Sequence, residues 1–446
     1  MANYFKGKRV TLMRVGLIGR GIGDAAYIAE AGGEVLVVDD ATQEVMQPAV
    51  DALSQYPNIT FKFGPYDFAD FKDADLVVVG AGAPLEEPVL VECKKAGVRL
   101  VQSAALFAEI SHVPIIGVTG TRGKSTVTHM IHHVLSFATG EEVLLGGNVR
   151  GVSNLQLLKQ VKEDSLCVME LDSWQLQGFG WAGISPQIAV FTNFMDDHLN
   201  YYSRGGKSYE EAMDLYFNDK AQIFLNQEES GVFITTPAVF ERAKKLAGTL
   251  GQEVILADAS ILPEDMLLAM PGEHNRLNAA LAYEALKAVG LTDDEIFDGL
   301  ASFPGVPGRL ELAADIAGVR VYNDNNATTP TATAAGIKAV AEGKNVVLIM
   351  GGADKGLDTA ALLEAIEESV KGVVLLPGTG TDKIKEAVPG EEVTSLEEAV
   401  KVALAQAATG DVVLFSPAFA SFGMFRNEYE RNDLFMKLIT EHESLS

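Results

Sequence analysis

The stretch of sequence that decides the fold is residues 115–126, which read Ile115-Ile116-Gly117-Val118-Thr119-Gly120-Thr121-Arg122-Gly123-Lys124-Ser125-Thr126. An apolar run leads into glycines and then into a helical pattern through Met130 and Val134, so the stretch predicts a strand, a loop and the start of a helix. Backbone N–H groups of such a loop converge on phosphate oxygens, and the partial positive charge of the helix N-terminus attracts them. We therefore predict a phosphate-binding site here.

The loop departs by one residue from the common phosphate-loop pattern, G-x-x-x-x-G-K-[ST]. Counting back from Lys124, the first glycine of the pattern falls on Val118, and Gly117 lies one place too early. Gly-Lys-Ser-Thr between a strand and a helix rarely arises by chance, so we favour phosphate binding over a turn that simply needs glycine. On this interpretation Lys124 contacts the terminal phosphates of a nucleotide, and Ser125 or Thr126 holds Mg²⁺. The other phosphate-binding residues of the loop are Gly120, Thr121 and Gly123.

Composition predicts an α/β protein of several domains. The chain has 446 residues, enough for roughly two to four domains, and it is 48% hydrophobic and 22% charged. Its net charge of -26 argues against a nucleic-acid partner, because phosphate backbones require stripes of Lys and Arg. Two cysteines, Cys93 and Cys167, are too few for a disulfide framework, and no apolar run approaches the ~18 residues of a membrane span. We expect a cytoplasmic monomer without a membrane span.

Residues 10–40 read as a strand, a glycine turn, a helix and a second strand, which is the opening of a Rossmann-like unit. We place the first strand in residues 10–18 and exclude a secretory signal, because Arg14 interrupts the apolar run. The glycines follow G-x-G-x-G, and Asp24 takes the place of the third glycine of the dinucleotide fingerprint, so a nicotinamide cofactor is poorly supported. Two alternatives stay open: a plain tight turn, or a nucleotide whose ribose lies near Asp39 or Asp40.

Polar side chains follow two later strands of the central segment. Glu170 ends the apolar run 166–169, and His198 comes shortly after the run 188–191. Because the carboxyl ends of parallel strands meet at one edge of a sheet, these two side chains could share Mg²⁺ beside the phosphate loop. Each residue alone is equally compatible with a solvated loop.

Short motifs recur along the whole chain. They are Thr119-Gly120-Thr121-x-Gly123-Lys124-Ser125, Gly146-Gly147-Asn148, Glu170-Leu171-x-Ser173-x-Gln175-Leu176, Asn193-x-x-x-Asp197-His198, His274-Asn275-x-x-Asn278-Ala279, Gly308-Arg309-Leu310-Glu311, Asn323-Asp324, Gly351-Gly352-x-Asp354-Lys355-Gly356 and Ser416-Pro417-Ala418-x-Ala420-Ser421. Together they resemble the Mur ligases, the ATP-dependent amide-forming ligases of peptidoglycan precursor synthesis, whose phosphate loop has the same one-residue offset. The resemblance implies three α/β domains: a Rossmann-like domain in residues 1–110 that holds a UDP-linked substrate, a central ATP-binding domain with a parallel sheet in residues 111–305, and a Rossmann-like domain in residues 306–446 that receives an amino acid.

The resemblance also implies roles for single residues. The catalytic residues would be Lys124, Glu170, His198 and Lys220, and those at Mg²⁺, of which two ions are expected, would be Ser125, Glu170, His198 and Lys220, the last as a carbamate. ATP would bind the loop residues 120–126 except Arg122, together with Asn275, Asn278, Arg309 and Asp324. The UDP-linked substrate would bind Gly19, Arg20, Gly21, Ile22, Asp39, Asp40, Gly82 and Asn148, and the amino acid would bind Thr328, Lys355 and Ser421. Without the resemblance, Lys220 reads as an ordinary helical lysine, as Lys207 does.

The motifs lie closest to those family members that add D-glutamate to UDP-N-acetylmuramoyl-L-alanine, and two positions depart from them. Asn326 stands where those members have a lysine, and Glu428 stands where they have an aromatic residue, unless a shift of one residue puts Tyr429 there. A carboxylate would repel glutamate unless Arg426 or Arg431 neutralises it. The acceptor is therefore open between D-glutamate, which we favour, and L-glutamate or another amino acid, as in a ligase of the folylpolyglutamate type. A non-catalytic nucleotide-binding protein is the third alternative.

Overall fold

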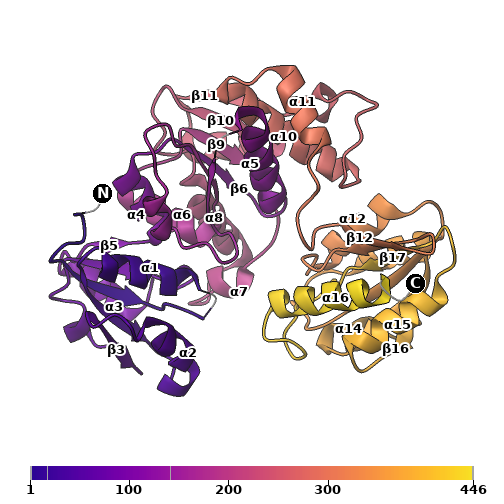
Figure 1. The fold of residues 1–446 in the computed structure, drawn as a ribbon, viewed down its shortest axis with the longest axis horizontal. Helices are drawn as coiled ribbons and strands as arrows, with labels where there is room; N and C mark the ends of the chain where they lie inside the picture. Colours follow the sequence, from indigo (N-terminus) through magenta and orange to yellow (C-terminus); the bar gives the residue numbers. More distant parts are fainter. Residues whose placement is uncertain (1–2, 18, 141, 444–446) are drawn as a thin grey trace. The chain divides into compact units, whose positions relative to one another are not determined.

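The computed structural model describes residues 3–17, 19–140 and 142–443, and it divides into two compact units. The first unit comprises Met1–Ile261 with Asn278–Gly299, and the second comprises Leu262–Leu277 with Leu300–Ser446. Figure 1 shows the three sheets along the chain, each covered by helices. The first two sheets belong to the first unit and the third sheet to the second. The chain thus has the α/β architecture that the sequence predicts, while the boundaries at residues 110 and 305 stay a prediction.

The first sheet is parallel and has the strand order β3-β2-β1-β4-β5. Its strands are β1 (Arg9–Met13), β2 (Glu34–Asp39), β3 (Ile59–Phe63), β4 (Leu76–Val79) and β5 (Leu100–Val101), and its helices are α1 (Arg20–Glu30), α2 (Gln43–Leu53), α3 (Pro88–Lys95) and α4 (Ser103–Ser111). The first strand is shorter than predicted, because Arg14 has a φ of 60° and ends the extended run after Met13. The last predicted residue, Ile18, lies outside the described residues.

The second sheet is also parallel, in the order β11-β10-β9-β6-β8-β7. Its strands are β6 (Ile115–Thr119), β7 (Leu144–Gly147), β8 (Cys167–Glu170), β9 (Ile188–Phe191), β10 (Val232–Thr235) and β11 (Glu253–Leu256). The helices along this part of the chain are α5 (Lys124–Thr139), α6 (Ser173–Ala182), α7 (Leu199–Tyr202), α8 (Tyr209–Ala221), α9 (Pro237–Ala247), α10 (Glu273–Val289) and α11 (Asp293–Ala301). Strand β6 is buried along its whole length between β8 and β9, so the ends of these three strands lie side by side.

The third sheet is mixed, in the order β12-β13-β17-β14-β15-β16, with β12 antiparallel to β13. Its strands are β12 (Glu311–Ile316), β13 (Val319–Asn323), β14 (Val346–Gly351), β15 (Val370–Leu376), β16 (Glu391–Glu392) and β17 (Val412–Phe415), and its helices are α12 (Pro330–Val340), α13 (Ala360–Ser369), α14 (Thr379–Ile384), α15 (Leu396–Gln406) and α16 (Glu428–Glu443). Strand β17 lies between β13 and β14, which brings the residues after all three strands to one edge. In the described part of the chain, no helix is long and apolar enough to cross a membrane.

Candidate active site

The phosphate loop joins β6 to α5 and depends on two glycines with positive φ. Gly120 has a φ of 147°, and a Cβ there would lie 1.9 Å from Thr192 Oγ1. Gly123, with a φ of 81°, precedes the first residue of α5, and its Cβ would lie 2.4 Å from Asn278 Oδ1. Neither position accepts a side chain, so these glycines keep the loop closely packed at the start of the helix.

The glycine that seemed misplaced, Gly117, has a different task. It lies inside β6, and a Cβ there would come within 2.4 Å of Pro186 Cγ. Gly117 is therefore required because β6 packs closely against Pro186. The glycines that shape the loop are Gly120 and Gly123.

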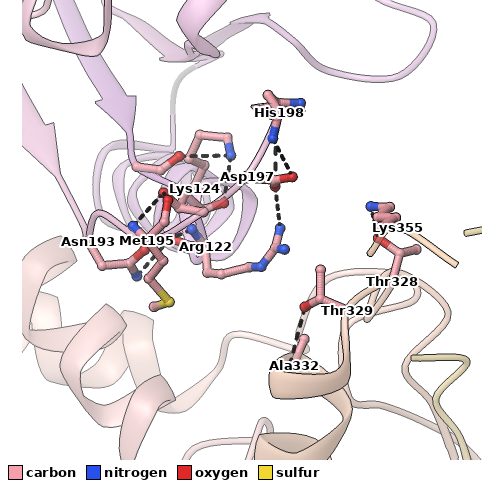
Figure 2. Close-up of polar contacts among 12 residues, drawn as sticks. Arg122, Lys124, Asn193, Met195, Asp197, His198, Thr328, Thr329, Ala332 and Lys355 are labelled. Carbon is pink, nitrogen blue, oxygen red and sulfur yellow. Dashed lines mark hydrogen bonds and ion pairs between the residues drawn. The ribbon is translucent and has the colours of Figure 1, made fainter. Parts of the chain in front are cut away.

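Lys124 is the first residue of α5, and its ammonium group folds back over the loop. Nζ donates to the carbonyl oxygens of Gly120 at 3.0 Å and of Thr121 at 3.2 Å (Figure 2). These contacts hold the positive charge beside the loop that it is predicted to serve. The helix has no side-chain cap at its N-terminus, where its partial positive charge favours an anion.

Residues after β9 hold the outer side of this loop. Asn193 accepts from the Arg122 backbone N–H at 2.9 Å and donates to the Arg122 carbonyl at 3.1 Å. The Arg122 guanidinium donates to Asp197 Oδ2 at 3.1 Å, and the His198 ring nitrogen Nε2 lies 3.8 Å from the same oxygen, as Figure 2 shows. The structure thus brings His198 to the phosphate loop through Asp197.

Lys220 lies in the last turn of α8, buried beneath the loop with 1% of its surface exposed. Its Nζ donates to the carbonyl oxygen of Gly120 at 2.8 Å and lies 3.5 Å from Thr119 Oγ1. Burial, reinforced by the neighbouring charge of Lys124, lowers the pKa of Lys220 well below its ordinary value. Lys220 is thus a buried side chain and not the solvated lysine that its helical position suggests, and its ammonium group loses its proton more readily than an ordinary lysine does.

Residues at the end of β8, in the second sheet, are linked through Asn148 to helix α1. The Asn148 backbone N–H donates to the Glu170 carbonyl at 2.7 Å, and Asn148 Nδ2 lies 3.4 Å from Glu170 Oε1. Arg20, at the start of α1, donates to Asn148 Oδ1. Arg20 and Asn148, both predicted to bind the UDP-linked substrate, are therefore in contact. Asn148 also lies beside Glu170, a predicted magnesium ligand.

The donor set fits Mg²⁺ better than a closed metal cage. Glu170 is a buried carboxylate at the end of β8, and Ser125 and His198 lie at the start of α5 and after β9. Among the described residues, no group of three or more His, Cys, Asp or Glu side chains forms a ready-made metal site. Mg²⁺ commonly takes one or two protein carboxylates and completes its shell with water and substrate phosphates, which agrees with this sparse set.

The other residues predicted for the UDP-linked substrate lie around the ends of β1, β2 and β4. Gly19 precedes α1 with a φ of 92°, and Gly21 and Ile22 lie in the first turn of that helix. Asp39 ends β2, where burial raises the pKa of its carboxyl, and Asp40 lies 3.5 Å from Arg14 in an exposed ion pair. Gly82, with a φ of 84°, lies next to the Trp174 ring.

Two residues predicted for ATP lie in the first two turns of α10, and two lie near β12 and β13. Asn278 packs on Gly123, while Asn275 donates to the Pro271 carbonyl at 2.9 Å. The Asp324 carboxylate accepts from Ser416 Oγ at 2.8 Å and from the Leu310 backbone N–H at 3.2 Å, which fixes the residue next to Arg309. Burial raises the pKa of Asp324 to about 7. Its contacts attach the segment that carries Arg309 to the third sheet.

The three residues predicted for the amino acid converge within the second unit. Lys355 Nζ donates to Thr328 Oγ1 at 3.1 Å (Figure 2). A two-way backbone bridge between Ala353 and Ala420, at 2.9 and 3.0 Å, brings the loop of Lys355 to that of Ser421. The edge of the third sheet therefore presents an ammonium group and two hydroxyl groups.

The arginines expected to neutralise Glu428 make their hydrogen bonds to other groups, although the charge of Glu428 acts on Arg431 and opposes the lowering of its pKa. Arg426 binds Glu430, with Nε 3.0 Å from Oε1. Arg431 is buried and donates to Asn325 at Oδ1 and at the carbonyl oxygen, both at 2.8 Å, and burial lowers its pKa to about 10. Asn325 in turn donates to the Glu428 carbonyl oxygen at 3.0 Å. The start of α16 is thus held through its backbone.

Several residues of this site carry no sequence signal strong enough to be found beforehand. Arg122 and Trp174 are the unspecified positions of two motifs, between Thr121 and Gly123 and between Ser173 and Gln175, and Asp219 belongs to none of the motifs. Asp219 is buried, accepts from Gln177 at 2.7 Å and from Tyr202 at 2.9 Å, and has a pKa raised to about 6 by burial. Its position directly before Lys220 was the only available signal.

Comparison with known proteins identifies the family. A family model described as the Mur ligase middle domain matches residues 118–256, and one described as the Mur ligase, glutamate ligase domain matches residues 308–419. A protein of Roseiflexus sp. (strain RS-1) is 33% identical over 97% of this chain and 98% of its own, and one of Geobacillus kaustophilus (strain HTA426) is 32% identical over 98% of each. Both are named UDP-N-acetylmuramoylalanine–D-glutamate ligase. The chain belongs to the Mur ligase family.

Solved structures of other Mur ligases share the fold of this one. A UDP-N-acetylmuramate-alanine ligase from Thermotoga maritima superimposes with a TM-score of 0.60 at 19% identity, covering 98% of this chain and 100% of its own. The MurF ligase from Thermotoga maritima in complex with ADP also gives 0.60, at 16% identity, covering 100% of this chain and 97% of its own. At these identities the likeness supports the three-domain architecture of the Mur ligase chain.

Proposed function

We propose that this Mur ligase adds D-glutamate to UDP-N-acetylmuramoyl-L-alanine, forming an amide with hydrolysis of ATP to ADP and phosphate. The observation that carries the proposal is the agreement of curated relatives over nearly the whole chain, which are named for this reaction. The phosphate loop, the Asn148 contacts and the Lys355 edge supply one place each for ATP, the UDP-linked substrate and the amino acid. The product is a precursor of peptidoglycan.

The chemistry begins with the carboxylate of the alanyl residue, which is a poor electrophile until it is phosphorylated. The carboxylate oxygen attacks the γ-phosphorus of ATP, ADP leaves, and an acyl phosphate forms. Lys124, held over the loop, places its charge where negative charge collects on the transferred phosphoryl group. The amine of D-glutamate then attacks the acyl carbon, the tetrahedral intermediate expels phosphate, and the amine proton is lost to give the amide.

Glu170, His198 and Ser125 would hold Mg²⁺ beside the loop, together with Lys220 as a carbamate. Bound there, Mg²⁺ would neutralise charge on the phosphoryl oxygens. The neutral amine that burial favours at Lys220 is the form that attacks CO₂: a nitrogen–carbon bond forms and a proton leaves, giving a carbamate anion. That anion suits a site whose only other buried carboxylate ligand is Glu170.

The amino acid at the third sheet is the least constrained part of the proposal. Lys355 offers a positive charge for a carboxylate, which suits glutamate. Asn326 and Glu428 depart from the pattern of D-glutamate ligases, and they favour as second candidate a Mur-type ligase that adds another amino acid. A non-catalytic nucleotide-binding protein would have no use for the Thr328, Lys355 and Ser421 edge.

The test is phosphate release with ATP, Mg²⁺ and UDP-N-acetylmuramoyl-L-alanine against a panel of D- and L-amino acids. Stimulation by D-glutamate above all others supports the proposal, and strong stimulation by another amino acid alone supports the second candidate. Because the two substrates, ATP and a UDP-linked precursor, are made in the cytoplasm, we place the reaction there. We also propose that the enzyme acts as a monomer.

A further inference from the structure

Asp24, the residue that breaks the dinucleotide fingerprint, makes contacts that the proposed chemistry does not use. Its carboxylate is buried in α1, and Oδ1 accepts from Ser153 Oγ at 2.6 Å and from the Leu155 backbone N–H at 3.0 Å. The two donors lie about 130 residues further along the chain, in the loop that follows β7. Burial raises the pKa of Asp24, and the hydrogen bonds from Ser153 and Leu155 oppose that shift, so loss of this side chain would leave both donors without their buried acceptor.

The neighbouring backbone is shaped for this contact. A Cβ at Gly23 would lie 2.6 Å from Ser153 Cβ, so only glycine allows the loop to approach α1 so closely. Gln156 Nε2 adds a hydrogen bond to the Gly23 carbonyl at 3.0 Å. The last glycine of the G-x-G-x-G turn is therefore explained by the loop that lies on it.

The same loop carries Asn148 at its other end. Asn154 Oδ1 accepts from the Gly147 backbone N–H at 2.7 Å, which ties the far end of the loop to the residue before Asn148. One turn before Asp24 on the helix, Arg20 donates to Asn148 Oδ1, and Asn148 binds Glu170. Helix α1 and the loop of residues 148–155 thus meet twice: once at the predicted substrate site, and once at Asp24.

We propose that Asp24 is a positioning residue, whose carboxylate holds the loop of residues 148–155 on α1 so that Arg20 and Asn148 stay together at the end of β8. The contact adds a polar attachment between α1 and the segment after β7, in a region where the first and second sheets also share one hydrophobic core. Arg20 and Asn148 are predicted to bind the UDP-linked substrate, so the kinetic consequence rests on the proposed function. The attachment of the loop to α1 by Asp24 does not depend on the proposed function.

The chain offers a matched control on the same helix. Glu30, in the last turn of α1, pairs with Lys159 at 2.5 Å, and both side chains are more than one third exposed. This pair also joins α1 to the segment after β7, but it lies away from Arg20 and in solvent. Exposed ion pairs contribute little, so Glu30→Ala is expected to change little.

The experiment compares Asp24→Ala, Ser153→Ala, their double variant and Glu30→Ala in the full-length enzyme. We expect Asp24→Ala and Ser153→Ala to raise the KM for UDP-N-acetylmuramoyl-L-alanine about tenfold, a change of about 1.4 kcal/mol. The kcat and the KM for ATP should stay within about twofold, because the phosphate loop is held separately by Asn193. The double variant should cost less than the sum of the two single variants, because the Ser153–Asp24 hydrogen bond is lost in each of them.

Calorimetric unfolding supplies a readout that is independent of the reaction. The first and second sheets share one hydrophobic core and should unfold in one transition, and in Asp24→Ala this transition should move to a lower temperature. If Asp24→Ala does not fold, Ser153→Ala carries the test, because the Leu155 hydrogen bond remains. Effects no larger than those of Glu30→Ala, or an equal rise in the KM values of ATP and the UDP-linked substrate, would overturn the proposal. A wild type without D-glutamate-dependent phosphate release would refute the proposed function, while the unfolding data would still decide the role of Asp24.

Discussion

Lys124 and Lys220 donate to the same atom, the carbonyl oxygen of Gly120, at 3.0 and 2.8 Å. Two ammonium groups so close repel each other, and Lys220 is the more deeply buried of the two. Burial and this repulsion both lower the pKa of Lys220, the lysine beneath the loop. This arrangement is the physical basis for assigning different roles to the two side chains.

Lys220 should carry a carbamate. After incubation with ¹³C-bicarbonate, the wild-type protein should show a carbamate carbon signal by NMR, and Lys220→Arg should lose it. Lys207→Arg, which replaces a more exposed lysine in the same region, is the control and should keep the signal. Lys220→Arg should also lower kcat at least about a hundredfold, as expected when charge stabilisation at a transferring phosphoryl group is lost. A fully active wild type without the signal would contradict this role.

Variants of the glycines at the two ends of α5 distinguish the cost of a strained backbone from a role in ATP binding. Gly123 and Gly140 both have positive φ, of 81° and 65°, but a Cβ at Gly140 meets open space. Gly140→Ala should therefore lower the free energy of unfolding by about 1–2 kcal/mol, the cost of a left-handed backbone, and leave ATP affinity unchanged. Gly123→Ala should also displace Asn278 and weaken ATP binding at least about tenfold, measured by titration calorimetry. Equal ATP affinities in the two variants would refute the assignment of the loop to ATP.

The local structure of this region could be predicted from sequence, and its close contacts could not. The strand, loop and helix at residues 115–126 follow from an apolar run, glycines and helical periodicity, and they are confirmed. No local pattern encodes the contact of Gly117 with Pro186, about 70 residues away. The same holds for the position of Lys220 beneath Gly120, about 100 residues away. The roles of the site residues came from the resemblance to a family, and they stay predictions until measured.

The contacts of Asp24 and Glu428 could not be predicted from the sequence, because distant parts of the chain supply their partners. Asp24 is visible in the sequence only as a broken fingerprint, because its partners lie in a distant loop. Glu428 is visible as a departure from the pattern. Of the arginines proposed to neutralise it, Arg426 binds Glu430, whereas Arg431 donates to Asn325 and still interacts with the charge of Glu428. Buried polar pairing depends on tertiary contacts, and that is why both interpretations needed the structure.

Asp219 makes stability depend on pH. Burial raises the pKa of Asp219 to about 6, from a reference value of 3.8, although Gln177 and Tyr202 donate to it. A raised pKa means that the folded state favours the protonated carboxyl, so its contribution is present below about pH 4 and is lost as the pH rises to about 6. The total change is on the order of 3 kcal/mol.

Urea unfolding of the wild type and Asp219→Asn at pH 4 and pH 8 measures this effect. Between the two pH values, the free energy of unfolding of the wild type should fall relative to that of Asp219→Asn, and above pH 6.5 the difference should be constant. Asp73→Asn, at an exposed position, should follow the wild type. A difference between wild type and Asp219→Asn that does not vary with pH would rule out the buried titration.

Lys355 should contribute to amino-acid binding and Lys383 should not. Lys355 binds Thr328 at the edge of the third sheet, whereas Lys383 lies 3.3 Å from Asp354 in a partly exposed ion pair. Lys355→Met should raise the KM for D-glutamate at least about tenfold, because a charge-assisted contact to a carboxylate is lost, and leave the KM for ATP unchanged. Lys383→Met should change both KM values less than about twofold in the same steady-state assay. The opposite order of effects would place the amino acid elsewhere.

The central claim is that D-glutamate attacks an acyl phosphate of UDP-N-acetylmuramoyl-L-alanine. The most direct measurement labels the alanyl carboxylate with ¹⁸O and follows the released phosphate by mass spectrometry in the presence of D-glutamate or L-glutamate. We predict rapid release with D-glutamate, little with L-glutamate, and one ¹⁸O atom in each phosphate, because the oxygen that attacks ATP leaves with the phosphoryl group. Phosphate without ¹⁸O, or release that depends on L-glutamate alone, would contradict the account.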